Sequence, residues 1–277
     1  MSSGKQKRNR TIRVGLGLLL LAAFLAIACD ARLCVRYYKI ESDKIAAPVR
    51  LAVVADLHSC AYGAGQRALT DAVLALEPDA VALVGDIVDD VLPEKNAWDT
   101  VSFLAERLPC FYVTGNHEYM SGEAERICRE MEAAGVEVLR GSSVRITTAA
   151  GQTLRLSGID DPKSGRSGRQ LAQVGAALDP GELNVLLAHR PEDIRAYLAY
   201  PFDLVLSGHA HGGQWRVPGL INGLYAPNQG LFPRYAGGWY TFPEAGFAVS
   251  RGLARESTRI PRLFNRPELV AVDVTPP

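Results

Sequence analysis

The chain has 277 residues, and its 30 lysines and arginines balance 30 aspartates and glutamates, so its formal net charge at pH 7 is zero. This balance argues against a general nucleic-acid binder, whose surface is usually basic, although it does not exclude a nucleotide-sized substrate. We therefore expect no stable nucleic-acid partner, and the length suits one large domain or two small ones.

The N-terminus has the pattern of a membrane anchor. Basic residues precede an uncharged run, Val14–Cys29, that is rich in leucine and alanine. They are Lys5, Lys7, Arg8, Arg10 and Arg13. A basic head before an apolar segment is typical of a signal peptide or a signal anchor, with the basic side in the cytoplasm. As a helix the run spans about 24 Å, against roughly 30 Å of hydrocarbon. The flanking Arg13 and Arg32 can snorkel to close the gap.

These features predict four segments. We expect a basic cytoplasmic N-terminus over residues 1–13, an uncleaved transmembrane signal anchor over 14–29, a linker over 30–48 and a catalytic domain over 49–277. The protein would then cross the cell membrane once, with the domain outside the cytoplasm. Two alternatives stay open, namely processing at the weak lipoprotein motif of residues 26–29 and a buried core helix, which the basic cluster disfavours.

From residue 49 the chain alternates between strand and helix patterns. Apolar, β-prone runs occur at Val49–Ala55, Ala80–Val84, Cys110–Val113 and Gly135–Leu139. Helical spacing of apolar residues separates them at Arg67–Leu76, Trp98–Leu108 and Glu123–Ala134. Short connections between alternating strands and helices predict parallel strands joined by crossover helices. In such sheets ligands bind beyond the carboxyl ends of the strands.

The second half continues with less helix. Strands are expected at Val144–Ile146, Leu154–Gly158, Leu183–Leu187, Asp203–Leu206, Ala248–Ser250 and Leu269–Val274. The first two would pair around a turn at Ala149–Gly151, and a helix is expected over Pro191–Ala199. The Gly/Ser/Arg-rich stretch Lys163–Arg169 favours a mobile loop, and Trp215–Tyr240 an irregular excursion or a hairpin.

Polar side chains follow the predicted strands at their carboxyl ends. They are Asp56, His58, Asp86, Asn116, His117, His189, His209 and His211. Carboxylates, imidazoles and a carboxamide suit divalent cations such as Mn²⁺, Fe²⁺, Zn²⁺, Co²⁺ or Ni²⁺. The set exceeds what one ion needs, and two ions roughly 3.5–4 Å apart would clamp a phosphate for attack by a metal-activated hydroxide. Each motif alone has a structural explanation as a helix cap, a turn or a solvated histidine.

These motifs together resemble the calcineurin-like metallophosphoesterases. The matching residues are Asp56-Leu57-His58, Gly85-Asp86, Gly115-Asn116-His117-Glu118, His189 and Gly208-His209-Ala210-His211. The extended Ser-Gly-His-x-His-Gly-Gly-Gln form is similar to a membrane-associated bacterial branch, some of whose members act on lipid-linked nucleotide-sugar phosphates. Glu118 departs from the family pattern, in which Asp is more usual at this position.

The resemblance implies an α/β fold, a four-layer α/β/β/α sandwich of two mixed β-sheets flanked by helices, after an N-terminal membrane-anchor helix. It implies one ion held by Asp56, His58, Asp86 and His211, and a second held by Asp86, Asn116, His189 and His209. Asp86 would bridge the two ions.

The resemblance also implies roles around the substrate. His117 would be catalytic near the leaving-group oxygen, with Glu118 or another acid orienting it. Arg190 and Arg251 are candidate substrate-binding residues, although a structural role for either is an equal alternative.

The sequence thus favours a membrane-anchored binuclear phosphohydrolase that uses two ions such as Mn²⁺, Fe²⁺ or Zn²⁺. Its substrate would be a phosphodiester or phosphomonoester, attacked by a metal-bridging hydroxide. The alternatives are a membrane-tethered metal-binding or scaffold protein without turnover, and a protein phosphatase. The only hint of a lipidic substrate besides the anchor is a set of aromatic residues that forms either an apolar rim or a packed hairpin. They are Tyr225, Phe232, Tyr235, Trp239 and Tyr240.

Overall fold

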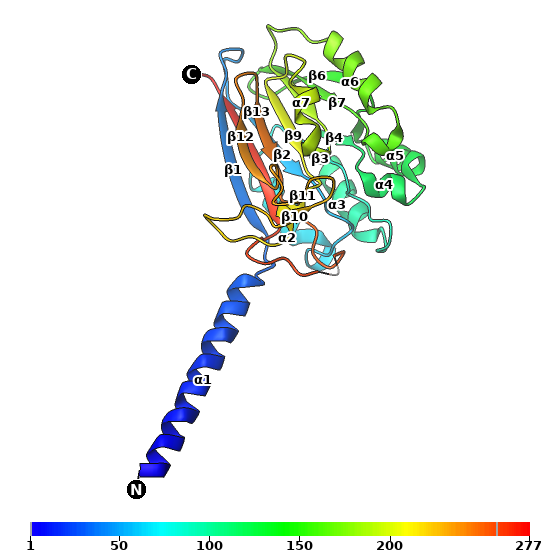
Figure 1. Ribbon diagram of the computed structural model, residues 1–277. Helices are drawn as coiled ribbons and strands as arrows, with labels where there is room; N and C mark the ends of the chain where they lie inside the picture. Colours follow the sequence, from blue (N-terminus) through cyan, green and yellow to red (C-terminus); the bar gives the residue numbers. More distant parts are fainter. Residues whose placement is uncertain (1, 259) are drawn as a thin grey trace.

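A single long helix projects from a layered domain (Figure 1). The computed structural model describes residues 2–258 and 260–277. Helix α1 (Ser2–Ala28) contains a segment, Thr11–Ala28, that is long and apolar enough to cross a membrane by length and composition. Of the basic N-terminus expected over residues 1–13, Met1 and the side chains of residues 2–8 and of Arg10 lie outside the described part.

The first sheet has six strands in the order β1-β14-β2-β3-β4-β5. Their bounds are β1 (Cys34–Glu41), β2 (Val49–Val54), β3 (Ala80–Val84), β4 (Cys110–Val113), β5 (Glu137–Val138) and β14 (Glu268–Thr275). Strands β2 to β5 pair in parallel, as the alternation of strand and helix predicted, whereas β14 is antiparallel to β2. The sheet is therefore mixed.

The second sheet also has six strands, in the order β12-β13-β9-β8-β7-β6. Their bounds are β6 (Ser142–Thr147), β7 (Thr153–Gly158), β8 (Asn184–Leu187), β9 (Leu204–Ser207), β12 (Gly238–Thr241) and β13 (Gly246–Val249). Strands β6 and β7 form the predicted antiparallel pair, and β7, β8, β9 and β13 run parallel. A small hairpin of β10 (Tyr225–Ala226) and β11 (Gly230–Leu231) lies outside both sheets.

The two sheets pack face to face with helices outside them, which confirms the four-layer sandwich. The alternation of β2 shows the arrangement, since Leu51 and Val53 join the core between the sheets while Ala52 and Val54 face the helices. Helices α2 (Arg67–Leu74), α3 (Lys95–Ala105) and α5 (Ala124–Ala133) cover the first sheet. Helices α6 (Ser167–Ala176) and α7 (Ile194–Tyr197) cover the second sheet.

The structure differs from the sequence prediction in three elements. The segment 30–48, expected as a linker, contains β1, which pairs in parallel with β14 along its whole length. Its mixed polarity reflects its place at the edge of the sheet, where several side chains remain exposed. The expected loop Lys163–Arg169 contains the start of α6, and a short helix, α4 (Asn116–Met120), begins directly at the end of the loop after β4.

Candidate metal centre

The loops that follow the strands of both sheets meet at one point. Asp56 follows β2, Asp86 follows β3, and Asn116 begins α4 after β4, so the first sheet supplies these side chains. The second sheet supplies His189, after β8, and the histidine pair after β9. Because the strands end at the same edge of each sheet, residues distant in sequence converge there.

The backbone at this point is strained. Several residues other than glycine adopt left-handed φ angles between 46° and 66°, a conformation that costs free energy for side chains with a Cβ. They are Asp56, His58, Asp86, His209 and His211. All five were predicted as metal ligands. Strain of this kind persists where the surrounding structure holds a functional geometry.

One group of side chains matches the first predicted ligand set. The ligand atoms of Asp56, His58, Asp86 and His211 lie within 4.8 Å of one another. His58 Nε2 lies 3.6 Å from Asp86 Oδ2, and His211 Nε2 lies 3.7 Å from Asp56 Oδ1. Three of the four residues are buried, so water competes little for these atoms.

A second group shares Asp86 with the first. The ligand atoms of Asp86, His189 and His209 also lie within 4.8 Å of one another, and His189 Nε2 is 3.1 Å from Asp86 Oδ2. Asn116, predicted in this set, lines the same cavity as Asp86 and His209. The two groups therefore meet at one carboxylate, as expected for a bridging ligand.

The hydrogen bonds of two histidines orient their rings toward the centre. His189 Nδ1 donates to the backbone oxygen of Val84 (2.8 Å), and His58 Nδ1 is 2.9 Å from Asp89 Oδ1. These contacts leave the Nε2 atom of each ring aimed into the centre. Both Nε2 atoms, with Asp86 Oδ2 and Asn116 Oδ1, are buried and have no hydrogen-bond partner among the described residues. Buried polar atoms without partners are costly, and coordination of an ion would satisfy them.

The charges of the centre also favour a cation. Burial alone would lower the pKa of His189, but the neighbouring carboxylates of Asp86 and Asp56 raise it to about 10, so they favour a positive charge at this ring, which a bound cation would supply in place of the proton. Burial, together with His189 and Arg190, lowers the pKa of His209 to about 3, so its ring is neutral, as a ligand must be. Since His209 Nε2 is 2.7 Å from the Arg190 guanidinium, Nδ1 is the atom left to bind an ion.

Comparisons with known proteins agree with this geometry. The sequence profile described as calcineurin-like phosphoesterase matches residues 49–213, which include every candidate ligand. The chain belongs to this family. It is 32% identical over 236 residues to phosphodiesterase YaeI of Escherichia coli, with 83% of each chain covered. This metallophosphoesterase is accordingly a metal-dependent phosphoester hydrolase, and the dependence on metal predicted from the sequence is confirmed at that level.

Other relatives of this metallophosphoesterase are longer. It is 30% identical over 183 residues to a Danio rerio transmembrane protein with metallophosphoesterase domain, a match that covers 60% of this chain and 41% of that protein. Among solved structures, the Thermus thermophilus protein TT1561 superposes with a TM-score of 0.50 at 11% identity, over 74% of this chain and 90% of that one. This last similarity concerns the fold alone.

His117 lies beside the two groups without completing either of them. Its backbone N–H donates to Asp86 Oδ1 (2.8 Å), and its ring Nδ1 is 2.6 Å from Asp90 Oδ1. The acid that orients His117 is therefore Asp90 rather than Glu118. The sequence carries a signal for this role, because Asp89-Asp90 closely follows the Gly85-Asp86 motif in the same loop.

Glu118 of this metallophosphoesterase supports the backbone of the centre instead. Its buried carboxylate accepts the N–H groups of Gly115 (2.8 Å), Ile87 (2.8 Å) and Asp86 (3.1 Å). It thereby ties the loop after β3 to the start of α4. This function explains why a longer carboxylate is accepted where Asp is more usual.

We expect Glu118→Ala to destabilise the fold by about 3 kcal/mol or more, because each buried N–H left without a partner costs about 1–3 kcal/mol. The free energy of unfolding, measured in urea, tests this. Glu132→Ala is the matched control, since Glu132 is exposed on the neighbouring helix α5, and it should change stability by less than about 0.5 kcal/mol. Equal stability of the two variants would contradict the structural role of Glu118.

The two arginines predicted to bind substrate have different surroundings. Arg190 is buried at the centre, where it pairs with Asp161 and lines the cavity of the second group. Arg251 is not brought there. Its Nη1 donates to Glu268 (3.0 Å) and its Nη2 to the backbone oxygen of Gly237 (3.2 Å), and it lines a separate cavity. These contacts favour the structural role that the sequence left as an equal alternative for Arg251.

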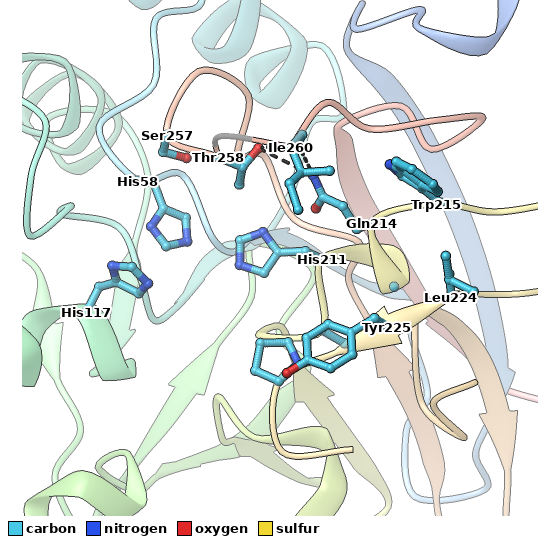
Figure 2. A pocket seen from close by; sticks show the side chains of 13 residues that line it. His58, His117, His211, Gln214, Trp215, Leu224, Tyr225, Ser257, Thr258 and Ile260 are labelled. Atoms are coloured by element: carbon cyan, nitrogen blue, oxygen red, sulfur yellow. Dashed lines mark hydrogen bonds between the residues drawn. The ribbon is translucent and has the colours of Figure 1, made fainter. Parts of the chain in front are cut away.

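Two cavities open from the centre. The polar one, about 760 Å³, lies beside the second group and includes Lys163 and Arg190. The other, about 490 Å³, is bounded on one side by His58, His117 and His211 (Figure 2). Its remaining wall is mostly apolar and includes Trp215, Leu224, Tyr225, Pro227 and Ile260. His117 and His211 line both cavities, so a substrate at the centre can extend into each.

The aromatic residues singled out in the sequence divide between two structural roles. Tyr225 lines the apolar cavity, and Phe232 is exposed on the neighbouring loop. Tyr235 and Tyr240 pack against each other with ring centroids 5.2 Å apart, and Trp239 packs against a strand of the first sheet. The stretch is thus a packed unit that contributes one side chain to the cavity.

Proposed function

We propose that this chain is a membrane-anchored phosphoesterase that uses two divalent ions, such as Mn²⁺, Fe²⁺ or Zn²⁺, and prefers a phosphodiester with an apolar group. The observation that carries the proposal is the position of Asp86 between two groups of buried ligands whose free atoms face each other. One ion would be held by Asp56, His58, Asp86 and His211. The other would be held by Asp86, Asn116, His189 and His209.

Two bound ions would polarise the phosphoryl oxygens and lower the pKa of a water molecule so that it can attack phosphorus. The chain itself supplies orientation. Asp89 and the backbone of Val84 hold His58 and His189 in fixed orientations. Arg190, held by Asp161, contacts His209 and thereby positions that ligand at the edge of the polar cavity.

His117 is placed to protonate the leaving group. Its ring is partly exposed, lines both cavities and is held at Nδ1 by Asp90, which leaves Nε2 to face a substrate. A histidine oriented by a carboxylate is a common general acid. The guanidinium of Arg190 is mostly engaged by protein partners. We therefore infer that Arg190 mainly positions His209 and contacts the substrate only at the edge of the phosphate site.

The apolar cavity supports a substrate with a hydrocarbon group. A phosphoryl group at the centre would leave such a group to contact Trp215, Leu224 and Ile260. Two further exposed apolar side chains adjoin this cavity, since Leu231 pairs with Tyr225 and the backbone N–H of Phe232 donates to Leu224. Exposed apolar surface beside a site is typical of contact with a membrane or an apolar ligand. The relatives named phosphodiesterase and transmembrane protein favour the same interpretation.

The proposed topology has the basic N-terminus in the cytoplasm, residues 14–29 in the membrane as a single span, and the domain on the outer side. The side chains of α1 along this span are exposed apart from Ala28, as a lipid-facing helix requires. A substrate in the outer leaflet would then be close to the centre.

The metal requirement is tested on the full-length protein, purified in detergent without chelator. We expect about two equivalents of divalent metal by elemental analysis, and hydrolysis of bis-p-nitrophenyl phosphate in the presence of Mn²⁺. A chelator should remove the bound metal and abolish hydrolysis, and added Mn²⁺ should restore hydrolysis. Stoichiometric metal without turnover of any phosphoester would favour a metal-binding protein instead, and a folded chain that binds no metal would overturn the ligand assignment.

The substrate class is tested with two phosphodiesters that share a head group and differ in acyl chain length. We expect kcat/KM to be about tenfold or more higher for the long chain, because burial of a few methylene groups contributes about 0.8 kcal/mol each. Trp215→Ala should reduce this preference, whereas Tyr37→Ala, an exposed aromatic residue on β1, should not. A preference for phosphopeptides over both lipids would support a protein phosphatase.

A further inference from the structure

A small basic cavity lies where the anchor helix meets the domain. Its volume is about 220 Å³, and Ile27, near the end of α1, forms part of its wall. Four arginines contribute to the lining, and they come from β1, the loop after β9, the loop after β13 and the segment before β14. They are Arg36, Arg216, Arg251 and Arg266.

The carboxylates in this cavity neutralise only part of its charge. Glu268 pairs with Arg251, at 3.0 Å. Asp30 is bound by Arg32 at 2.9 Å and lies 3.4 Å from Arg266. Arg36 and Arg216 have no carboxylate partner within the described residues.

The guanidinium of Arg216 is half-buried and lies near other positively charged side chains. Its Nε donates to the backbone oxygen of Asn222 (3.1 Å). Burial and the nearby guanidinium groups of Arg251 and Arg36 lower its pKa, but an arginine remains charged at neutral pH. Holding four arginines beside only two carboxylates, Asp30 and Glu268, is unfavourable, and a bound anion would offset the remaining repulsion.

The cavity lies at the level where a membrane surface would be. The backbone N–H of Phe264 donates to the oxygen of Ala28, the last residue of α1, at 2.6 Å, and the ring of Phe264 contacts Phe24 at 5.5 Å between centroids. These contacts hold the end of α1 against the segment before β14, at the place where the helix meets the domain (Figure 1). An apolar helix that ends at Ala28 would place the cavity among the lipid head groups.

We propose that this cavity binds the phosphate head group of an anionic phospholipid next to the anchor. The inference rests on the proposed anchoring by α1 but not on catalysis, since the cavity is separate from the metal centre. Guanidinium groups bind phosphate through paired, charge-assisted hydrogen bonds, and basic residues at a membrane surface attract anionic lipids. Binding would also stabilise the wall of the apolar cavity. The backbone N–H of Arg216 donates to the backbone oxygen of Leu263 (3.0 Å), and Arg216 directly follows Trp215, which lines that cavity.

The test uses the full-length protein in detergent, to which phosphatidylglycerol or phosphatidylcholine is added, with bound lipid counted by native mass spectrometry. We expect one tightly bound phosphatidylglycerol, and affinity for phosphatidylcholine at least tenfold lower. Arg36→Gln and Arg216→Gln should each weaken phosphatidylglycerol binding about fivefold, the effect of one basic residue near a membrane surface. Arg129→Gln, which removes an exposed charge on α5, should have no effect.

Equal binding of the two lipids, or unchanged binding in both cavity variants, would overturn the proposal. Inorganic phosphate that binds as tightly as phosphatidylglycerol would assign the site to a soluble anion instead. Flotation of the protein with phosphatidylcholine vesicles distinguishes loss of lipid selectivity from failure of the anchor. An anchored protein floats whether or not the cavity selects a lipid. Arg36 is exposed on an edge strand, so its variant should fold normally.

Discussion

Replacing Asp86 with asparagine is expected to abolish hydrolysis of bis-p-nitrophenyl phosphate and to remove most of the bound metal. Asp86 Oδ2 lies 3.1 Å from His189 Nε2 and 3.6 Å from His58 Nε2, so both ligand groups depend on it. Oδ1 also accepts the N–H of His117. Burial raises the pKa of Asp86, but His189 and His58 outweigh this and hold it well below its ordinary value, so the carboxylate is ionised.

Asparagine keeps the shape of the side chain but removes its negative charge, and it places an N–H₂ group toward one of the two groups of candidate ligands. The loss should exceed the 10- to 100-fold effect typical of residues that only support a ligand. Metal content by elemental analysis and kcat with saturating Mn²⁺ are the measurements. Asp99→Asn, on the solvent side of α3 and paired with Lys95, is the control and should behave as the parent protein. An Asp86→Asn protein that keeps about two metal equivalents would refute the bridging role.

His117→Ala should lower kcat by about 10²–10⁴-fold while leaving the metal content unchanged. The reason is that His117 lines both cavities, yet is absent from the two groups that share Asp86. A general acid matters most when the leaving group is a poor one. We therefore expect a larger defect for an alkyl phosphodiester than for a p-nitrophenyl ester.

The acid that holds His117 gives an internal check on this mechanism. Asp90→Asn should retain metal and reduce kcat less than His117→Ala, because the histidine would remain but lose its orientation. Loss of metal in His117→Ala would instead make His117 a ligand, together with His58 and Asp89, whose ligand atoms lie near it. A defect independent of the leaving group would indicate stabilisation of phosphoryl charge rather than proton transfer.

The clustering of the candidate ligands was largely predictable because these residues are tied to local patterns. Asp56 and Asp86 each follow a short apolar strand, and the pair His209 and His211 follows another. Parallel strands bring their carboxyl ends together, so the order of the elements implies that side chains of the same sheet converge, while the packing of the two sheets joins Asp56 and Asp86 to the histidine pair. The sandwich of two sheets follows from the same alternation together with the family resemblance.

What surrounds the centre depended on tertiary contacts. The direction of each side chain after the loops have packed decides whether Glu118 or Asp90 faces His117. The spacing of residues in the sequence does not determine that direction. The sequence left Arg251 either at the substrate or in a structural role, and its guanidinium pairs with Glu268, a residue in the last strand.

The cavities show the same division. The apolar wall unites Leu224 and Tyr225 with Ile260, and the basic cavity unites Arg36 of the first strand with Arg216. The sequence alone determined the anchor pattern, the alternation of strands and helices and the ligand types, because those depend on local periodicity and on where a strand ends. Only the tertiary structure decided which distant side chains share a cavity and which charges remain unpaired, because both depend on long-range packing.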